Sequence, residues 1–400
     1  MAQSSLPTST KLNTAPWLGI GGLLLVLSAL HVIVDTSACI VTPLWPELER
    51  HLVMSDGGVM WLIVLWQIST SFSQFFFGWF ADQFRARWLI WVGPCVAVVC
   101  MSAIGIAPNA IMVGVFLTLG GLGIAAFHPE AAAAAGSTSP ENRSRAMSVF
   151  AIGGYLGQAI GPATAGGLVQ GYGFPGLLAI MFLLLLILPT VCIPSFRRSF
   201  DSAASKTKSE PLLIALRGKG LGVTLVLLIQ TLRVITTMGV ALTIPFLLDQ
   251  QFRSTADIGF VGSAFNVGIG VGGVICALVV RKSFERTLLF VIPLLVMVPL
   301  WFMPMYIDSL LKTWVLAAVC GGLLGIVLPI MIGYGQQLIP TAQRMASSLT
   351  MGVSWGIGGA ILAGYLYVLK ANGTVESAFN VFLIASAASS VASLFLPRVK

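Results

Sequence analysis

The chain has 400 residues, of which 57% are hydrophobic and only 9% are charged, and its mean hydropathy is +0.94. Soluble domains are about 45–50% apolar and about 25% charged, and a single hydrophobic core stops growing at roughly 250–300 residues. The composition therefore excludes a soluble globular protein and predicts an all-α polytopic membrane protein. A net charge of +8 also occurs in nucleic-acid-binding proteins, but the positions of the charges, given below, indicate membrane topology and no nucleic-acid partner.

Apolar runs long enough to cross a bilayer, which takes about 20 helical residues, recur twelve times. Their approximate ranges are 17–45, 57–80, 88–107, 110–135, 146–170, 174–194, 220–248, 257–280, 287–306, 313–338, 345–369 and 377–397. Polar, glycine or proline clusters separate the runs, as at Pro108-Asn109. The sequence thus predicts twelve transmembrane helices.

Six cysteines lie in apolar runs, at positions 39, 95, 100, 192, 276 and 320. None of their spacings matches a metal-binding motif such as C-x-x-C, and we interpret them as small core residues without disulfides. The sequence predicts no metal site and no cofactor.

The basic residues are distributed unequally between the two sides of the predicted membrane. If residues 1–16 form a cytoplasmic tail, 17 of the 22 Lys and Arg residues fall in the tail, the cytoplasmic loops and the C-terminus. Four lie on the opposite side (Arg50, Arg253, Lys312 and Lys370), and one, Arg233, lies inside a span. This asymmetry follows the positive-inside rule. We therefore expect both termini in the cytoplasm and the protein in the inner (plasma) membrane.

The longest hydrophilic segment, residues 195–219, divides the chain into two sets of six spans, 17–194 and 220–397. The pattern Arg145-x-x-Ser148-x4-Gly153-x3-Gly157 recurs as Arg344-x-x-Ser347-x4-Gly352-x3-Gly356, 199 residues later. Matches between small residues also arise by chance, but the equal spacing and the central basic loop favour a duplication. Two six-helix bundles related by a pseudo-twofold axis along the membrane normal resemble the plan of the major facilitator superfamily.

The turn between the second and third spans resembles a second feature of that superfamily, the motif G-x-x-x-D-(R/K)-x-G-x-(R/K)-(R/K). Gly78, Asp82 and a basic residue are retained, whereas Gln83 replaces the first basic residue and the second glycine is missing. Arg85 and Arg87 follow Asp82 in the same turn. Pairing of Asp82 with a neighbouring arginine would gate one conformation. The alternative is a solvated turn without such a role.

The fifth span carries glycines on one helical face, including Gly157 and Gly161, followed by Pro162. Such faces allow helix backbones to approach closely, and generic packing is one interpretation. The segment also resembles the superfamily's antiporter motif, although three residues instead of two separate Pro162 from the following glycine pair. This resemblance implies proton-driven efflux.

Five ionisable side chains lie well inside the spans, where each costs about 2.5–3.5 kcal/mol on insertion scales. They are His31, Asp35, His128, Glu130 and Arg233. His31 and Asp35 are four residues apart and share a helix face. His128 and Glu130 are separated by about 200° around an ideal helix, so they point in different directions and a catalytic pair is not expected. Pro129 between them removes a backbone donor and can bend the helix.

Structural roles remain open for each group individually: His31 as an interhelical donor, His128 as a support for the bend, and either carboxylate as a fixed partner of Arg233. A carboxylate shielded from water binds a proton more readily, and an opposite charge nearby has the converse effect. We therefore expect proton coupling, with Glu130 the preferred carboxylate and Asp35, His31 and His128 the other candidates. The planar guanidinium of Arg233 suits an organic anion. The further substrate-binding candidates are Gln230, Asn266 and Gln336.

Several of these segments together resemble the fosmidomycin-resistance family, a bacterial inner-membrane branch of the major facilitators. The segments are His31-x3-Asp35, Phe127-His128-Pro129-Glu130-Ala131, the glycine face of the fifth span, and Tyr334-Gly-Gln336-Gln337-Leu-Ile-Pro340. The resemblance implies efflux of a drug or metabolite by proton antiport. The family commonly has Ser-Arg after the His-Pro-Glu core, where this chain has alanines.

These observations predict a secondary transporter that exports a small organic drug or metabolite, charged or neutral, in exchange for protons and functions as a monomer. Arg233 makes an anion one candidate substrate. The same residues permit uptake by proton symport. An enzyme is not expected, because no nucleophile and base occur together. A sensor or scaffold would be expected to carry an appended soluble domain, whereas the loops here are short.

Overall fold

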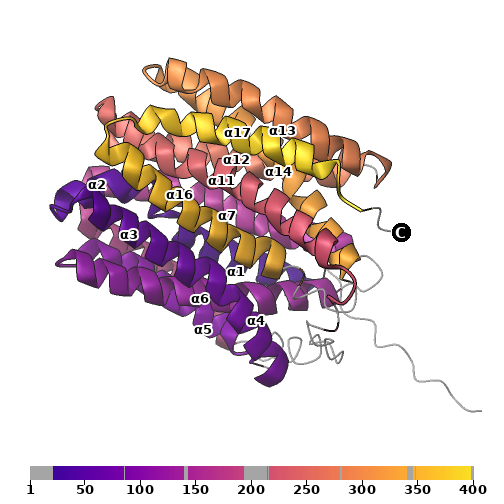
Figure 1. Ribbon diagram of the computed structural model, residues 1–400. Helices are drawn as coiled ribbons and strands as arrows, with labels where there is room; N and C mark the ends of the chain where they lie inside the picture. Colours follow the sequence, from indigo (N-terminus) through magenta and orange to yellow (C-terminus); the bar gives the residue numbers. More distant parts are fainter. Residues whose placement is uncertain are drawn as a thin grey trace, which may run out of the picture.

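The computed structural model describes residues 21–84, 86–138, 143–192, 214, 216–279, 282–339, 346 and 348–397, and the regular elements in this part are helices. We call residues 21–192 the N-terminal half and residues 216–397 the C-terminal half. In Figure 1 the helices of residues 22–137 occupy the lower part of the molecule and those of residues 220–393 the upper part.

The N-terminal half begins with α1 (Gly22–Cys39), η1 (Thr42–Leu44) and α2 (Trp45–His51). It continues with α3 (Asp56–Gln67), the π-helical turn η2 (Ile68–Phe72), α4 (Ser73–Phe84), α5 (Leu89–Ala103), η3 (Ile104–Ile106) and α6 (Ala110–Ser137). The last elements are α7 (Arg143–Tyr172), the 3₁₀ segment η4 (Phe174–Leu183) and α8 (Leu184–Cys192).

The C-terminal half contains α11 (Gly220–Gln250), α12 (Thr255–Val279), η5 (Lys282–Phe284), α13 (Glu285–Phe302), η6 (Pro304–Tyr306) and α14 (Leu310–Leu338). It ends with the π-helical segment η8 (Ser348–Val353), α16 (Ser354–Ala371), η9 (Val375–Ser377) and α17 (Ala378–Ser393). Each of the twelve apolar ranges read from the sequence is therefore occupied by a helix, continuous or broken.

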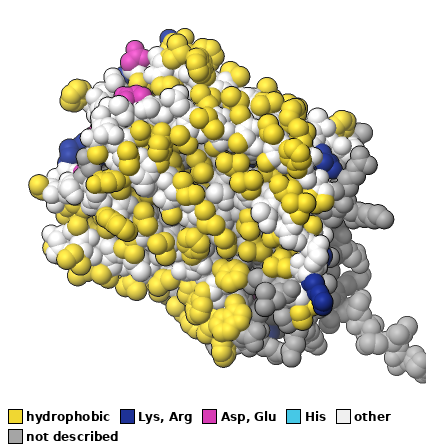
Figure 2. Space-filling view, in the orientation of Figure 1, with side chains coloured by type: hydrophobic (Ala, Val, Ile, Leu, Met, Phe, Trp, Pro, Cys, Tyr) yellow, Lys and Arg dark blue, Asp and Glu magenta, His cyan; other side chains and the backbone are white. Residues whose placement is uncertain are grey.

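Ten helices of the described part are long and apolar enough to cross a membrane, and a shorter apolar helix spans Phe174–Thr190. Large hydrophobic side chains such as Trp61, Ile111 and Leu186 are exposed. Figure 2 shows hydrophobic side chains over the middle of one face and charged ones near its ends. A surface of this kind suits lipid, in which helices satisfy their own backbone hydrogen bonds.

Short polar sequences set where several helices begin. The side chain of Ser55 accepts a hydrogen bond from the backbone of Gly58 (3.2 Å), and Asn109 Oδ1 accepts one from Met112 (3.0 Å). These contacts cap amide groups that have no partner within the helix. At the start of α12, Ser254 and Asp257 cap each other's backbone amides at 3.4 and 3.1 Å.

Backbone features repeat at the spacing of the sequence duplication. Val53 and Phe252, the two non-glycine residues of the described part with positive φ, follow α2 and α11 and are 199 positions apart. Helix-interior prolines recur at the same interval, Pro94 in α5 and Pro293 in α13.

Within the N-terminal half, α1 packs on α7 and α5 packs on α6; within the C-terminal half, α12 packs on α14 and α11 packs on α17. The most extensive contacts between the halves are those of α7 with α12 and of α3 with α16. The α1–α7 contact is very close. A Cβ placed on Gly157 would lie 2.4 Å from the carbonyl oxygen of Val32, so only glycine fits there. This close approach brings the polar side chains of α1 and α7 together.

Candidate functional site

A cavity of about 220 Å³ lies between the two halves. Its walls are mainly apolar, with alanines of α6 and leucines of α14 among them, and they contain a small number of polar side chains. The polar residues come from both halves: His31, Asp35, Gln74, His128, Tyr155 and Gln158 on one side, and Arg233, Thr237, Gln336 and Ser348 on the other. An apolar cavity with few polar groups is typical of a small-molecule site.

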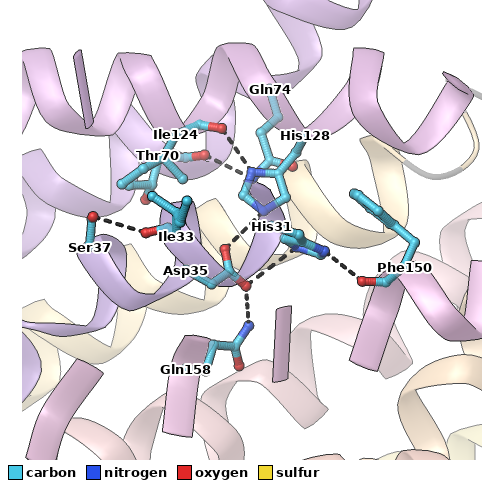
Figure 3. A network of polar contacts seen from close by, with 10 residues as sticks. All are labelled: His31, Ile33, Asp35, Ser37, Thr70, Gln74, Ile124, His128, Phe150 and Gln158. Atoms are coloured by element: carbon cyan, nitrogen blue, oxygen red, sulfur yellow. Dashed lines mark hydrogen bonds and ion pairs between the residues drawn. The ribbon is translucent and has the colours of Figure 1, made fainter. Parts of the chain in front are cut away.

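Asp35 is the centre of a buried polar cluster on the N-terminal side of the cavity (Figure 3). Its Oδ1 lies 3.1 Å from Nε2 of His128 on α6. Its Oδ2 accepts a hydrogen bond of 2.8 Å from Nε2 of Gln158 on α7 and lies 3.5 Å from Nε2 of His31. Two other helices, α6 and α7, therefore direct one polar group each at this carboxylate, in addition to His31 from its own helix.

The two imidazoles of this cluster are oriented by backbone carbonyls. Nδ1 of His31 lies 2.8 Å from the carbonyl oxygen of Phe150, and Nδ1 of His128 lies 2.8 Å from that of Ile124. Because a carbonyl oxygen only accepts, each Nδ1 must carry the hydrogen. A neutral imidazole then presents the lone pair of Nε2 to the carboxylate of Asp35, which is repulsive. A cation such as a proton, placed between Nε2 of a histidine and the carboxylate of Asp35, would remove this repulsion.

The same three side chains could also hold a metal ion by geometry alone, since the donor atoms of His31, Asp35 and His128 lie within 4.8 Å of one another. The sequence predicts no metal site. His128 is 93 residues from Asp35, so no local spacing signals the cluster.

Arg233 on α11 lies on the C-terminal side of the cavity and is only 4% exposed. Its Nε donates to Gln230 Oε1 at 2.9 Å and its Nη1 to Thr237 Oγ1 at 3.4 Å, while Nη2 is buried without a partner. The guanidinium lies 5.8 Å from the ring centre of Trp355. Among the described residues no carboxylate forms an ion pair with it. A buried, uncompensated cation with a free donor is suited to an anionic ligand.

The remaining candidates from the sequence occupy different places. Gln336 lines the cavity, and the side chain of Gln230 supports Arg233. Asn266 lies outside the cavity lining and donates from Nδ2 to the backbone oxygen of Gln158 at 2.8 Å. Glu130 is 7% exposed and does not line the cavity. The structure thus groups the two histidines with Asp35, not with Glu130, because His128 and Glu130 lie on different faces of α6.

The gating candidates are located at helix contacts. A Cβ on Gly78 would lie 3.3 Å from Ser348 Oγ, across the contact between the halves. A Cβ on Gly161 would lie 2.6 Å from the carbonyl oxygen of Thr36, so Gly161, like Gly157, seats α1 on α7. Pro162 contacts α12 at Gly259 and Gly262.

The ion pair predicted for the turn between the second and third spans falls mostly outside the described residues. The side chain of Asp82 and the whole of Arg85 lie outside the described residues, and Arg87 lies in the turn before α5.

Sequence reasoning missed Gln158, although it is a polar residue within the glycine face of the fifth span. It also missed Tyr155 and Trp355, which line the cavity. Neither has a charge or a spacing that distinguishes it from ordinary aromatic residues in a membrane helix.

The cavity extends toward one end of the molecule. Its lining includes Ala133, Met147, Gln336 and Ser348, which lie near the ends of α6, α7, α14 and η8 that border residues 138–143 and 339–348. The topology read from the sequence assigns this end to the cytoplasm.

At the opposite end, ion pairs join the two halves. Glu49 on α2 pairs with Lys370 at the end of α16, and Arg50 pairs with Asp249 at the end of α11 and with Glu47. We call Glu49–Lys370 and Arg50–Asp249 the inter-half ion pairs.

Comparisons with known proteins agree with this geometry. The family model described as Major Facilitator Superfamily matches residues 24–363. The fosmidomycin resistance protein of Escherichia coli (strain K12) is 24% identical over 371 residues, which cover 90% of this chain and 89% of that protein. YfnC, an uncharacterized MFS-type transporter of Bacillus subtilis (strain 168), is 24% identical over 156 residues, 39% of this chain and 38% of that protein. The first of these relatives confirms the resemblance to the fosmidomycin-resistance family. Because the family model spans most of the chain, the protein belongs to the major facilitator superfamily.

Proposed function

We propose that this protein is a proton-coupled exporter of a small organic anion in the inner membrane. Its twelve helical segments would form two six-helix bundles around the central cavity, with both termini in the cytoplasm, and one chain would suffice for transport. The unequal distribution of Lys and Arg residues and the recurrence of backbone features at 199 positions support this arrangement.

The observation that carries proton coupling is the cluster around Asp35. Both histidines point Nε2 at its carboxylate while Nδ1 is committed to a backbone carbonyl. A proton bound among the three groups replaces a repulsive contact by charge-assisted hydrogen bonds. We therefore assign proton binding to Asp35 with His31 and His128, and place Glu130 outside this machinery.

Substrate binding is assigned to the opposite wall. A carboxylate or phosphonate group fits the free Nη2 of Arg233, and its organic body would lie against the apolar walls. An anion at Arg233 and a proton at Asp35 occupy one cavity, so each can influence which end of the cavity is open. Exchange of the two ligands between the sides of the membrane is then antiport.

Export, in preference to uptake, is supported by the relative named for fosmidomycin resistance. The polar residues of the cavity would serve either direction, and uptake by proton symport is the alternative that the experiment must separate.

The test uses everted membrane vesicles that contain the protein and a pH-sensitive dye. With a pre-formed proton gradient, addition of fosmidomycin is expected to release protons from the vesicles, and vesicles without the protein are the control. Dissipation of the gradient without net accumulation of the drug, or proton movement together with the drug in the symport direction, would contradict antiport. If fosmidomycin has no effect, a resistance screen of a deletion strain and an overexpressing strain identifies the compound to use.

A further inference from the structure

Pro162 leaves one backbone group of α7, the carbonyl oxygen of Gln158, without its ordinary helical partner. In an α-helix the carbonyl oxygen of Gln158 accepts from the amide of residue 162, which proline lacks. Next to the proline, the amide of Ala163 donates to Ser263 Oγ on α12 at 3.0 Å. The proline thus opens one turn of α7 toward the other half.

Asn266 of α12 forms a hydrogen bond with the carbonyl oxygen of Gln158. Its Nδ2 donates to the backbone oxygen of Gln158 at 2.8 Å. Asn266 and Ser263 are three residues apart, so both face α7 from the same side of α12. These two side chains therefore join the halves through backbone groups of α7, and Asn266 binds the carbonyl oxygen that Pro162 leaves free.

Gln158 therefore forms hydrogen bonds through both its side chain and its backbone. Its side chain donates to Asp35 Oδ2 at 2.8 Å, and its backbone accepts from Asn266. The first bond is charge-assisted while Asp35 is ionised and weakens when the carboxyl group is protonated. In the described part of the chain, Gln158 is the residue that forms hydrogen bonds both to Asp35 and to the C-terminal half.

Asp35 is surrounded by titratable groups on several elements. His31 and Cys39 lie on α1, His128 lies on α6, and Tyr155 lies on α7. Arg233 on α11 lines the same cavity, and Glu130 on α6 lies outside the lining. Among these groups, those on other elements that contact Asp35 directly do so within the N-terminal half, so the bond through Gln158 is the path to α12.

We propose that Gln158 is a positioning residue that transmits the protonation state of Asp35 to the α7–α12 contact between the halves. This inference rests on the proposed function, because it requires that Asp35 binds a proton. Pro162 and Asn266 serve the same link, the first by freeing the carbonyl oxygen of Gln158 and the second by binding it.

The experiment measures conformation with protons as the only ligand. Spin labels are attached through non-canonical amino acids at Val53 and Phe252, which are 90% and 98% exposed at the same end of the two halves. Inter-label distance distributions are recorded in nanodiscs across a pH series. Wild type is expected to shift its population with pH, and a coupling of about fivefold is within the usual range for linked sites.

Three variants separate the link from general stability. Asn266→Leu removes the inter-half bond, and Pro162→Ala restores an amide that competes for the Gln158 carbonyl within α7. Both are expected to abolish the pH-dependent shift while leaving the Asp35–Gln158 contact intact. Ser263→Ala, on the same face of α12, removes the bond to Ala163 only, and is expected to retain the shift. Thermal melting of each variant checks that it is folded.

The outcomes distinguish the two proposals. A wild type without any pH-dependent shift contradicts proton coupling and this inference together. A normal shift in wild type and also in Asn266→Leu and Pro162→Ala overturns the inference alone. Equal loss in all three variants, including Ser263→Ala, also overturns it, because the effect is then general loosening of the α7–α12 contact. If Asn266→Leu does not fold, the pH-dependent shift of Pro162→Ala alone tests the inference.

Discussion

At the scale of single residues, the cavity has a cation, Arg233, on one wall and a carboxylate, Asp35, on the opposite wall. Arg233 is supported by Gln230 and Thr237 but keeps one buried nitrogen without a partner. Leaving a charged donor unsatisfied is costly, so a ligand that supplies an anionic oxygen removes this cost on binding. Arg233 therefore favours a ligand with a negative charge, and the apolar walls favour a ligand whose remainder is an organic group.

Replacing Arg233 is expected to separate charged from neutral compounds. Arg233→Ala should weaken binding of an anionic substrate by about 1.5–3 kcal/mol, roughly ten- to a hundredfold, because a charge-assisted contact is lost. A neutral ester of the same compound should bind nearly unchanged. Competition binding to the purified protein measures both affinities.

Arg233→Lys is the matched control for charge. It retains the cation but loses the planar fork, so we expect an intermediate affinity for the anion. Equal losses for the anion and its ester would mean that Arg233 shapes the cavity and does not recognise charge.

At the scale of helices, the site depends on how closely α1 approaches α7. His31 and Asp35 could be assigned to one face from their spacing, and the glycine face of α7 could be read from its sequence. What the sequence could not predict is that the two faces meet. Gln158 is 123 residues from Asp35. Which helices pack against each other over such a separation depends on how their side chains fit together, and this cannot be read from one sequence.

Adding one methyl group at this contact is expected to disturb the site. In Gly157→Ala the new Cβ would lie 2.4 Å from the Val32 carbonyl oxygen and 3.0 Å from Asp35 Cβ. Overpacking of this kind costs about 1–3 kcal/mol, so the melting temperature and transport should both fall.

Gly167→Ala tests the same substitution on the same helix in open space, since a Cβ there would have no neighbour within 4 Å. We expect it to melt at or slightly above the wild-type temperature, because alanine favours a helix more than glycine does. Identical behaviour of the two variants would show that the close approach at Gly157 is not required.

At the scale of the whole molecule, the cavity reaches toward one end, and the inter-half ion pairs join the halves at the other. The twelve helical ranges were predictable because hydropathy along the chain is strongly segmented. The inter-half ion pairs were not predictable, since Glu49 and Lys370 are 321 positions apart and each looks like an ordinary loop charge. Glu130 was the preferred proton-binding carboxylate on sequence grounds, because the sequence does not show that Asp35 and His128 are in contact.

Removing one inter-half ion pair is expected to favour separation of the halves at the end where these pairs lie. Lys370→Met leaves Glu49 without this partner, and a partly exposed pair is worth up to about 1 kcal/mol, which corresponds to about fivefold in population. The distance distribution between labels at Val53 and Phe252 should shift toward longer distances.

Lys312→Met is the control, because Lys312 lies over the ring of Tyr306 in its own half. It removes one lysine without breaking a contact between the halves, so the distribution should stay as in wild type. A shift of the same size in both variants would assign the effect to net charge.

The central claim is that Asp35, with its two histidines, binds the coupling proton. The most direct test compares Asp35→Asn with Glu130→Gln in vesicles, using the compound that wild type transports. We predict that Asp35→Asn retains substrate exchange at equal pH on both sides but loses accumulation driven by a proton gradient, whereas Glu130→Gln keeps both. Gradient-driven accumulation that survives in Asp35→Asn, or is lost only in Glu130→Gln, would contradict the account.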